Sequence, residues 1–88
     1  MNLQEFTTML AQEGYENLVT IEREANGFLD THTHPFAAKA LILEGEIRIQ
    51  YDDHDKLWTV GEIFQLDAEV PHKEQYGPAG VKYLVGRK

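Results

Sequence analysis

Short runs of alternating apolar and polar residues, separated by turn-forming residues, extend over residues 18–86 of this chain of 88 residues. In the clearest run, 46–51, the apolar residues Ile47, Ile49 and Tyr51 alternate with charged or polar neighbours. Successive side chains of a β-strand point to opposite faces, so this spacing predicts a strand with one buried face. About seven or eight such strands with regular turn signals are typical of an all-β sandwich or barrel.

Turn signals divide these runs at regular intervals. Asn26-Gly27 is typical of a β-hairpin turn. Gly45 is expected to close the strand that precedes it, and residues 77–80, Gly-Pro-Ala-Gly, are expected to form another turn before the last strand.

A different periodicity precedes the strands. Leu3, Phe6 and Leu10 recur at intervals of three and four residues, which places them on one face of an α-helix. Gly14 fits the position just beyond a helix end. The sequence therefore predicts one short helix over residues 3–13, which must pack against the strands because it is too short to be stable alone.

The charge balance argues against several classes of partner. The chain carries 15 acidic and 8 basic residues, a net charge of −7, and the basic residues are scattered. Binding to nucleic acid or to an anionic membrane is therefore not expected, because both depend on clustered Lys and Arg. The chain has no cysteine, which excludes disulfides and thiolate metal sites. Without a long apolar run or a basic leader, a cytoplasmic location is expected.

Three of the four histidines form a pattern that suits a metal ion. His32 and His34 are two residues apart in an extended segment, so their side chains share one face, about 7 Å apart along the strand. His72 follows Pro71 at the start of a later strand and would complete a set of three. On this spacing alone, metal binding and a chance pair of surface histidines are equally open.

The order of these residues resembles the two sequence motifs of the cupin superfamily. The first motif has a Gly, then His-x-His, a Glu and a second Gly, and it is similar to the series Gly27, His32, His34, Lys39 and Gly45. The second motif has a Gly that opens a strand, a Pro-x-Gly turn and a His, and it is similar to residues 61–72. Glu69 stands where the second motif has the glycine of its turn.

The resemblance implies a single cupin domain over residues 1–88, with a helix in 1–14 and a jelly-roll β-barrel over 18–86. It also implies that the protein binds one divalent metal ion, Zn, Ni, Fe, Mn or Cu, through the inward-facing side chains of His32, His34 and His72.

Cupins include enzymes and sensors, so the resemblance leaves the activity open. The first expectation is a small metal-dependent enzyme, dioxygenase-like or isomerase-like, that acts on a small organic anion and forms a homodimer through exposed strand edges. The alternatives are a sensor or binding module that holds an anion without metal, and a structural partner protein with a relict site. No catalytic residue is assigned.

Lys39 occupies the place of the motif's glutamate and is expected near the metal ligands. An ammonium about 4 Å from a dication would be repelled by roughly 8 kcal/mol at an effective dielectric constant of 20. Three outcomes are open: the amine is neutral, it leans to the barrel mouth and pairs with an acid, or the metal is absent. Tyr83 is expected to reach the pocket as a proton donor, or else to be an ordinary core tyrosine.

Overall fold

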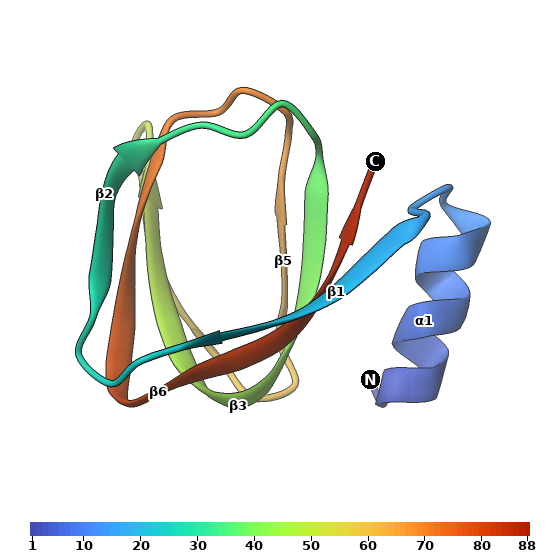
Figure 1. The fold of residues 1–88 in the computed structure, drawn as a ribbon, viewed down its shortest axis with the longest axis horizontal. Helices are drawn as coiled ribbons and strands as arrows, with labels where there is room; N and C mark the ends of the chain where they lie inside the picture. The colour runs from blue at the N-terminus through green and yellow to red at the C-terminus, as the bar shows by residue number, and fades with distance from the viewer.

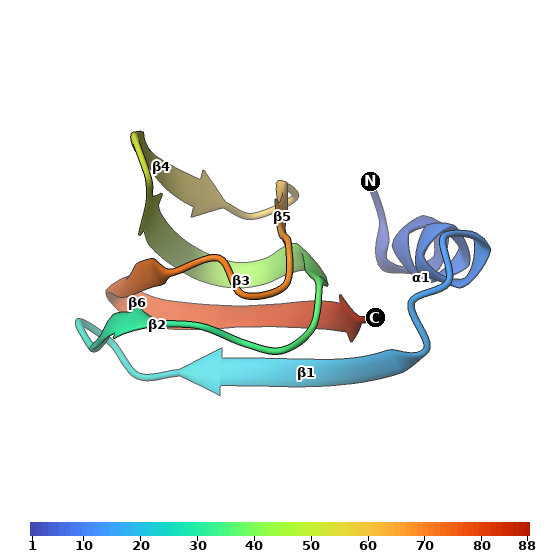
Figure 2. The ribbon, with the colours of Figure 1, turned by 90° about the horizontal axis from the view of Figure 1, so that it is seen from above.

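The computed structural model describes all 88 residues and contains one helix and six strands (Figures 1 and 2). The elements are α1 (Leu3–Gln12), β1 (Asn17–Arg23), β2 (Phe28–His32), β3 (Ala38–Tyr51), β4 (His54–Thr59), β5 (Ile63–Leu66) and β6 (His72–Arg87). All strand pairs are antiparallel. The predicted all-β class with one short N-terminal helix is confirmed.

The strands form two layers that share the long strands β3 and β6. In the first layer, β1 pairs with the C-terminal half of β6, which pairs with the N-terminal half of β3, which pairs with β5. In the second layer, β2 pairs with the N-terminal half of β6, which pairs with the C-terminal half of β3, which pairs with β4. Figure 1 shows β3 and β6 curving from one layer into the other around a common interior, with α1 outside.

Two glycines permit the bend between the layers. Gly45 and Gly80 have positive φ, 72° and 73°, and the register between β3 and β6 shifts on either side of Gly45. A Cβ atom on Gly45 would collide with the carbonyl oxygen of Gly80. Gly45 therefore bends a strand instead of closing it, and residues 77–80 lie within β6 instead of forming a turn between two strands. Because β3 and β6 each continue through a predicted turn, the protein has six strands instead of the predicted seven or eight.

Asn26-Gly27 forms a turn but not the predicted hairpin, because β1 and β2 do not pair with each other. Each pairs with a different half of β6. The turn is fixed to β6 by two backbone hydrogen bonds, in which the Asn26 N–H donates to Gly77 and the Tyr76 N–H donates to Gly27, both at 2.9 Å. The chain therefore crosses from one layer to the other at this turn.

The main hydrophobic core lies between the layers, on the inward faces of the strands. Ile47 and Ile49 are almost completely buried, and Arg48 between them is exposed, as the alternation predicted. The buried members of this core are Ala38, Ala40, Ile42, Ile47, Ile49, Phe64, Leu66, Tyr76, Val81, Tyr83 and Val85.

A second, smaller core joins α1 to the outer face of β3. Phe6 and Leu10 of the helix are fully buried against Leu41 and Tyr15. Burial of each large apolar side chain contributes roughly 1.5–3 kcal/mol, and a ten-residue helix depends on such packing because it is marginal on its own. A capping box between Asn2 and the third residue of the helix starts α1.

The protein has no helix with the length and apolar character that crossing a bilayer requires.

Gly45→Ala is expected to destabilise the protein far more than Gly61→Ala. Both glycines have positive φ, 72° and 87°, so both alanines bear the left-handed strain of about 1–2 kcal/mol. Only the new Cβ at position 45 collides with backbone, since the space around Gly61 is open. Urea unfolding measures both free energies of unfolding, and equal losses would contradict the close approach of β3 and β6.

Candidate metal centre

A cavity of about 250 Å³ lies in the interior of the barrel and takes residues from both layers. Its apolar wall consists of Ile21, Leu29, Phe36, Ala38, Ile49, Phe64, Leu66 and Val85. Its polar and charged side chains are Arg23, His32, His34, His72, Glu74, Tyr83 and Arg87. A small apolar cavity with a few convergent polar groups is the usual form of a ligand site.

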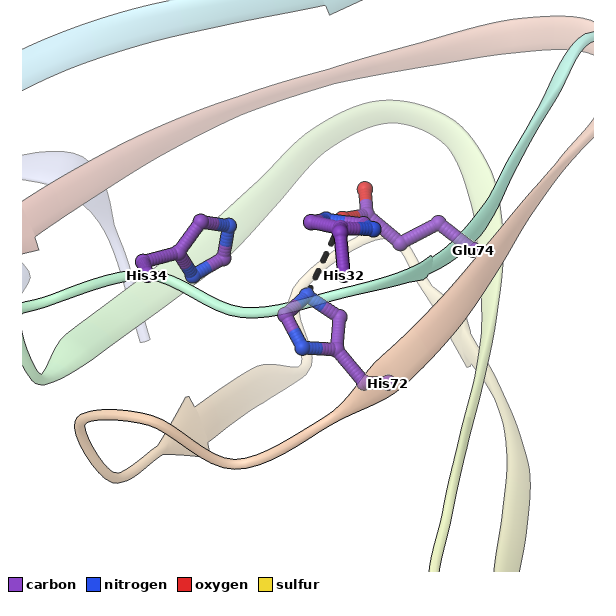
Figure 3. Close-up of side chains that lie close together, drawn as sticks. All are labelled: His32, His34, His72 and Glu74. Atoms are coloured by element: carbon purple, nitrogen blue, oxygen red, sulfur yellow. Dashed lines mark hydrogen bonds and ion pairs between the residues drawn. The ribbon is translucent and has the colours of Figure 1, made fainter.

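The structure brings His32, His34 and His72 together at this cavity (Figure 3). His32 ends β2 and lies directly opposite His72, the first residue of β6. The ring centroid of His72 is 4.3 Å from that of His32 and 4.7 Å from that of His34. The predicted convergence of two strands on one group of imidazoles is therefore present, and it depends on the pairing of β2 with β6.

Glu74 joins the three histidines, and the sequence analysis missed it. Its Oε2 atom lies 3.0 Å from His32 Nε2 and 3.2 Å from His72 Nε2, and the residue is only 8% exposed. The signal was available, because Glu74 follows His72 at position i+2, the same spacing as between His32 and His34, and on β6 this spacing puts both side chains on one face. The first motif has its glutamate at the position of Lys39 on β3, whereas the glutamate of this protein is Glu74 on β6.

Backbone carbonyls orient two of the imidazoles. Nδ1 of His32 lies 2.7 Å from the Asp30 carbonyl oxygen, and Nδ1 of His72 lies 2.9 Å from that of Val70. A carbonyl oxygen only accepts hydrogen bonds, so each Nδ1 carries a proton and donates it. In neutral histidines this leaves both Nε2 lone pairs directed toward Glu74, the arrangement that metal-ligating histidines adopt.

The four side chains fit one metal ion in number, type and spacing. One ligand atom from each of His32, His34, His72 and Glu74 lies within 4.8 Å of all the others. Two donors on opposite sides of one ion lie about 4.2 Å apart, twice a metal–nitrogen bond of about 2.1 Å. The largest separation allowed for this group, 4.8 Å, is close to that value. Three imidazoles and one carboxylate form a set of donors that divalent transition metals accept.

Burial and mutual charge set the protonation of this group in the metal-free protein. Burial is the largest influence on His72 and lowers its pKa, but the hydrogen bonds to Glu74 and Val70 and the charge of Glu74 outweigh it and raise the pKa overall. Burial acts to raise the pKa of Glu74, but His72 and His32 together lower it. For His34, burial and the neighbouring histidines lower the pKa. Glu74 is therefore a carboxylate and His72 its main proton partner.

Lys39 does not lie in the cavity, contrary to the expectation from its place in the first motif. It points to the outer face of β3, where its Nζ donates to Glu13 Oε1 at 2.7 Å. The neighbouring residue Ala38 takes the inward position and lines the cavity. The pairing with an acid that sequence analysis left open thus occurs, but outside the barrel instead of at its mouth. No ammonium group opposes a cation here.

Tyr83 lines the cavity and also belongs to the main core, and its hydroxyl stays protonated. The residue is 8% exposed, and burial followed by the charge of Glu74 raises its pKa well above the usual range. Tyr76 lies beyond Glu74, and its hydroxyl donates to Glu74 Oε1 at 3.3 Å. Burial and the same charge raise the pKa of Tyr76 to about 12.

The turn before His72 keeps the shape of a glycine turn without the glycine. Glu69 has φ 65°, the left-handed conformation that glycine adopts most easily. Its N–H donates to the His34 carbonyl at 2.7 Å, which fixes the turn to the segment that carries the first two histidines. This hydrogen bond offsets part of the backbone strain of about 1–2 kcal/mol.

Sequence comparison finds no relative, and structure comparison finds many. No protein-family model matches the sequence, and no curated protein matches it. An RmlC-like cupin from Shewanella frigidimarina superposes with a TM-score of 0.68 at 21% identity, over 80% of this chain and 63% of that one. The DMSP lyase DddQ from Ruegeria pomeroyi gives 0.73 at 19% identity, over 81% and 36%. An oxalate decarboxylase from Lactobacillus farciminis, solved as a formate complex, gives 0.72 at 20% identity, over 81% and 22%.

These likenesses concern the fold. This chain spans 63% or less of the length of the three proteins. At such identities the superposition shows that the backbones follow the same course. It does not show that the activities are the same. The chain therefore has the cupin fold, a jelly roll of antiparallel strands with one short helix, as its two motifs predicted.

Glu74→Gln is expected to lower the pKa of His72, because the variant removes the carboxylate charge while the imidazole stays buried. Protonated His72 stabilises the metal-free fold below the unfolded-state pKa of about 6.5. That contribution is lost as the pH rises through the raised folded-state pKa, and the variant should lack it. NMR titration of the imidazole C–H signals measures the pKa.

Glu22→Gln is the matched control, because it removes the same charge from a side chain that is 71% exposed on β1. The control should leave the His72 titration unchanged. An unaltered His72 pKa in the Glu74→Gln variant would show that the two side chains are not in contact.

Proposed function

We propose that this chain binds one divalent metal ion through His32, His34, His72 and Glu74 and uses it to act on a small organic anion in the cavity. The observation that carries the proposal is the orientation of the imidazoles of His32 and His72. Each is fixed at Nδ1 by a backbone carbonyl and directs Nε2 toward the same carboxylate oxygen.

Glu74 changes the electrostatics that the sequence predicted for the site. Three neutral histidines alone would leave a dication with its full charge, whereas one carboxylate offsets half of it. The donor set suits Fe, Mn, Ni, Cu or Zn, because imidazole and carboxylate are both acceptable to these ions. The remaining positive charge favours an anionic ligand at the open coordination positions.

The chemistry at this site would combine the metal with a neutral phenol. A bound divalent ion polarises a carbonyl or carboxylate oxygen, and iron would also support dioxygenase-like chemistry. Tyr83 keeps its proton throughout the physiological range and can donate a hydrogen bond to an oxygen of the bound anion. A dioxygenase-like or isomerase-like enzyme is therefore proposed. The lyase and the decarboxylase that share the fold support an enzyme over a structural protein.

A metal-free binding module is the second candidate. Its support is the presence of Arg23 and Arg87 in the cavity wall, since two guanidinium groups can hold a carboxylate without a cation. The candidates separate under a chelator: anion binding by the metal-dependent site is lost with EDTA, and binding by the arginines alone survives it.

We further propose that the protein forms a homodimer and is located in the cytoplasm. β1 pairs only with β6 and β4 pairs only with β3, so each leaves one edge without strand partners. Such edges are the usual places where a second copy adds its own strand. Analytical ultracentrifugation tests the dimer independently of the metal.

One equivalent of Co²⁺ or Zn²⁺ is expected to bind to untagged, metal-free protein. His72→Ala and Glu74→Gln should each weaken binding at least about tenfold, because the first removes an imidazole ligand and the second removes the negative charge of the carboxylate. Lys39→Met and His54→Ala are the controls, since neither side chain lines the cavity, and both should match the parent. Competition with a chromogenic chelator measures the affinities, and indistinguishable affinities in all four variants would refute the site.

The metal affinity is also expected to fall as the pH falls. A proton and the metal compete for Nε2 of His72, whose pKa is raised, so the loss begins at a higher pH than for an ordinary histidine. Glu74, with its lowered pKa, competes only under more acidic conditions. The same titration repeated between pH 5 and 8 tests the direction, and an affinity independent of pH would contradict it.

A further inference from the structure

Arg87 contains the only buried side-chain nitrogen or oxygen in the protein that has no hydrogen-bond partner. That atom is its Nε. The side chain stands at the last position of β6 and lines the cavity that holds the histidines. Buried donors in native proteins are nearly always paired, so an unpaired donor beside a cavity is free to bind an acceptor that enters the cavity.

Phe36 holds the guanidinium in place without using its donors. The Cζ atom of Arg87 lies over the Phe36 ring, 4.7 Å from its centroid. The Phe36 ring is in turn stacked on that of His34, at 5.0 Å and 10° between planes. A cation over a ring face is attracted by the π-electrons, so the N–H groups of Arg87 remain available. The stack also fixes the guanidinium at a set separation from the histidines.

The three arginines of the chain differ in whether they form an ion pair: the one on the surface does, and the two at the cavity do not. Arg48, on the exposed face of β3, forms an ion pair with Asp55 at 2.7 Å. Arg23 and Arg87 line the cavity, and neither has an acidic partner within ion-pair distance. In a chain with 15 acidic residues, both arginines without an acidic partner line the cavity that holds the histidines.

The net positive charge of the cavity lining favours a ligand with more than one negative group. Glu74 is the only acidic side chain in the lining, against two arginines. Once a dication is bound, the excess positive charge exceeds what a single carboxylate at the metal can offset. The volume of about 250 Å³ lies below the range of roughly 300–1,000 Å³ typical of sites for larger molecules, so the ligand is small.

We propose that Arg87 is the specificity-determining residue of this site and binds a carboxylate at the far end of the ligand. The ligand is then a small two-ended acid, with an oxygen donor at the histidines, a carboxylate at Arg87 and a short carbon chain against the apolar wall. The Arg87 end follows from the orphaned Nε and its support by Phe36. The metal end rests on the proposed function.

The test uses Co²⁺-loaded protein and two series of probes in calorimetric titrations. The diacids are malonate, succinate, glutarate and adipate, and the monoacids are propionate, butyrate, valerate and hexanoate. At least one diacid should bind tenfold or more tightly than every monoacid. Arg87→Gln should abolish that preference while the cobalt content stays at the parent value, and Arg87→Lys should restore part of it because it keeps the charge but not the planar fork.

Arg48→Gln is the matched control and should retain the full preference, because its guanidinium lies outside the barrel. Retention of the diacid preference in the Arg87→Gln variant would overturn the proposal, as would the lack of any preference in the parent. If that variant fails to fold, the Arg87→Lys variant and the parent protein still decide the question.

A separate measurement on metal-free protein distinguishes failure of the metal site from failure of this proposal. In ¹⁵N-labelled parent protein, the Nε–H signal of Arg87 should shift on titration with succinate or glutarate. If the parent binds no cobalt but this signal shifts, the metal site is refuted, whereas the assignment of Arg87 as a carboxylate-binding group stands. If the signal does not move with any diacid, Arg87 serves only to pack against Phe36.

Discussion

The long pairing between β3 and β6, bent where Gly45 meets Gly80, is the constraint on which the rest of the structure depends. Each layer of the barrel consists of one half of this pair with two further strands added. The bend also lets one strand serve two ends of the cavity. β6 supplies His72 and Glu74 before the bend and Tyr83 and Arg87 after it.

Local patterns in the sequence predicted the parts of the fold that depend on residues close together in the chain. The alternation around Ile47 and Ile49 and the helical spacing of Phe6 and Leu10 both correspond to buried faces in the structure. Turn signals were less informative, because a glycine with positive φ can end a strand or bend one. At Gly45 the close approach of Gly80 decides between these outcomes, and Gly80 is distant in the sequence.

The candidate site shows the same division between local and distant information. The two-residue spacing of His32 and His34 and the position of His72 were enough to predict their convergence. The carboxylate was sought on β3 by analogy, where Lys39 stands, but strand alternation turns that side chain outward. Glu74 offers its carboxylate from β6, across the barrel from that position. The pairing of His32 with His72 across β2 and β6 brings Glu74, two residues further along β6, to the same centre.

The two faces of β3 serve separate purposes, and this separation has a consequence for how the protein can vary. Ala38 faces the cavity, whereas Lys39 and Leu41 bind the helix segment through Glu13 and the small outer core. Substitutions at inward-facing positions of β3 therefore leave its contacts with the helix in place, and substitutions on its outer face leave the cavity lining in place. The residues that line the cavity and those that hold the helix can thus vary independently, although one strand carries both.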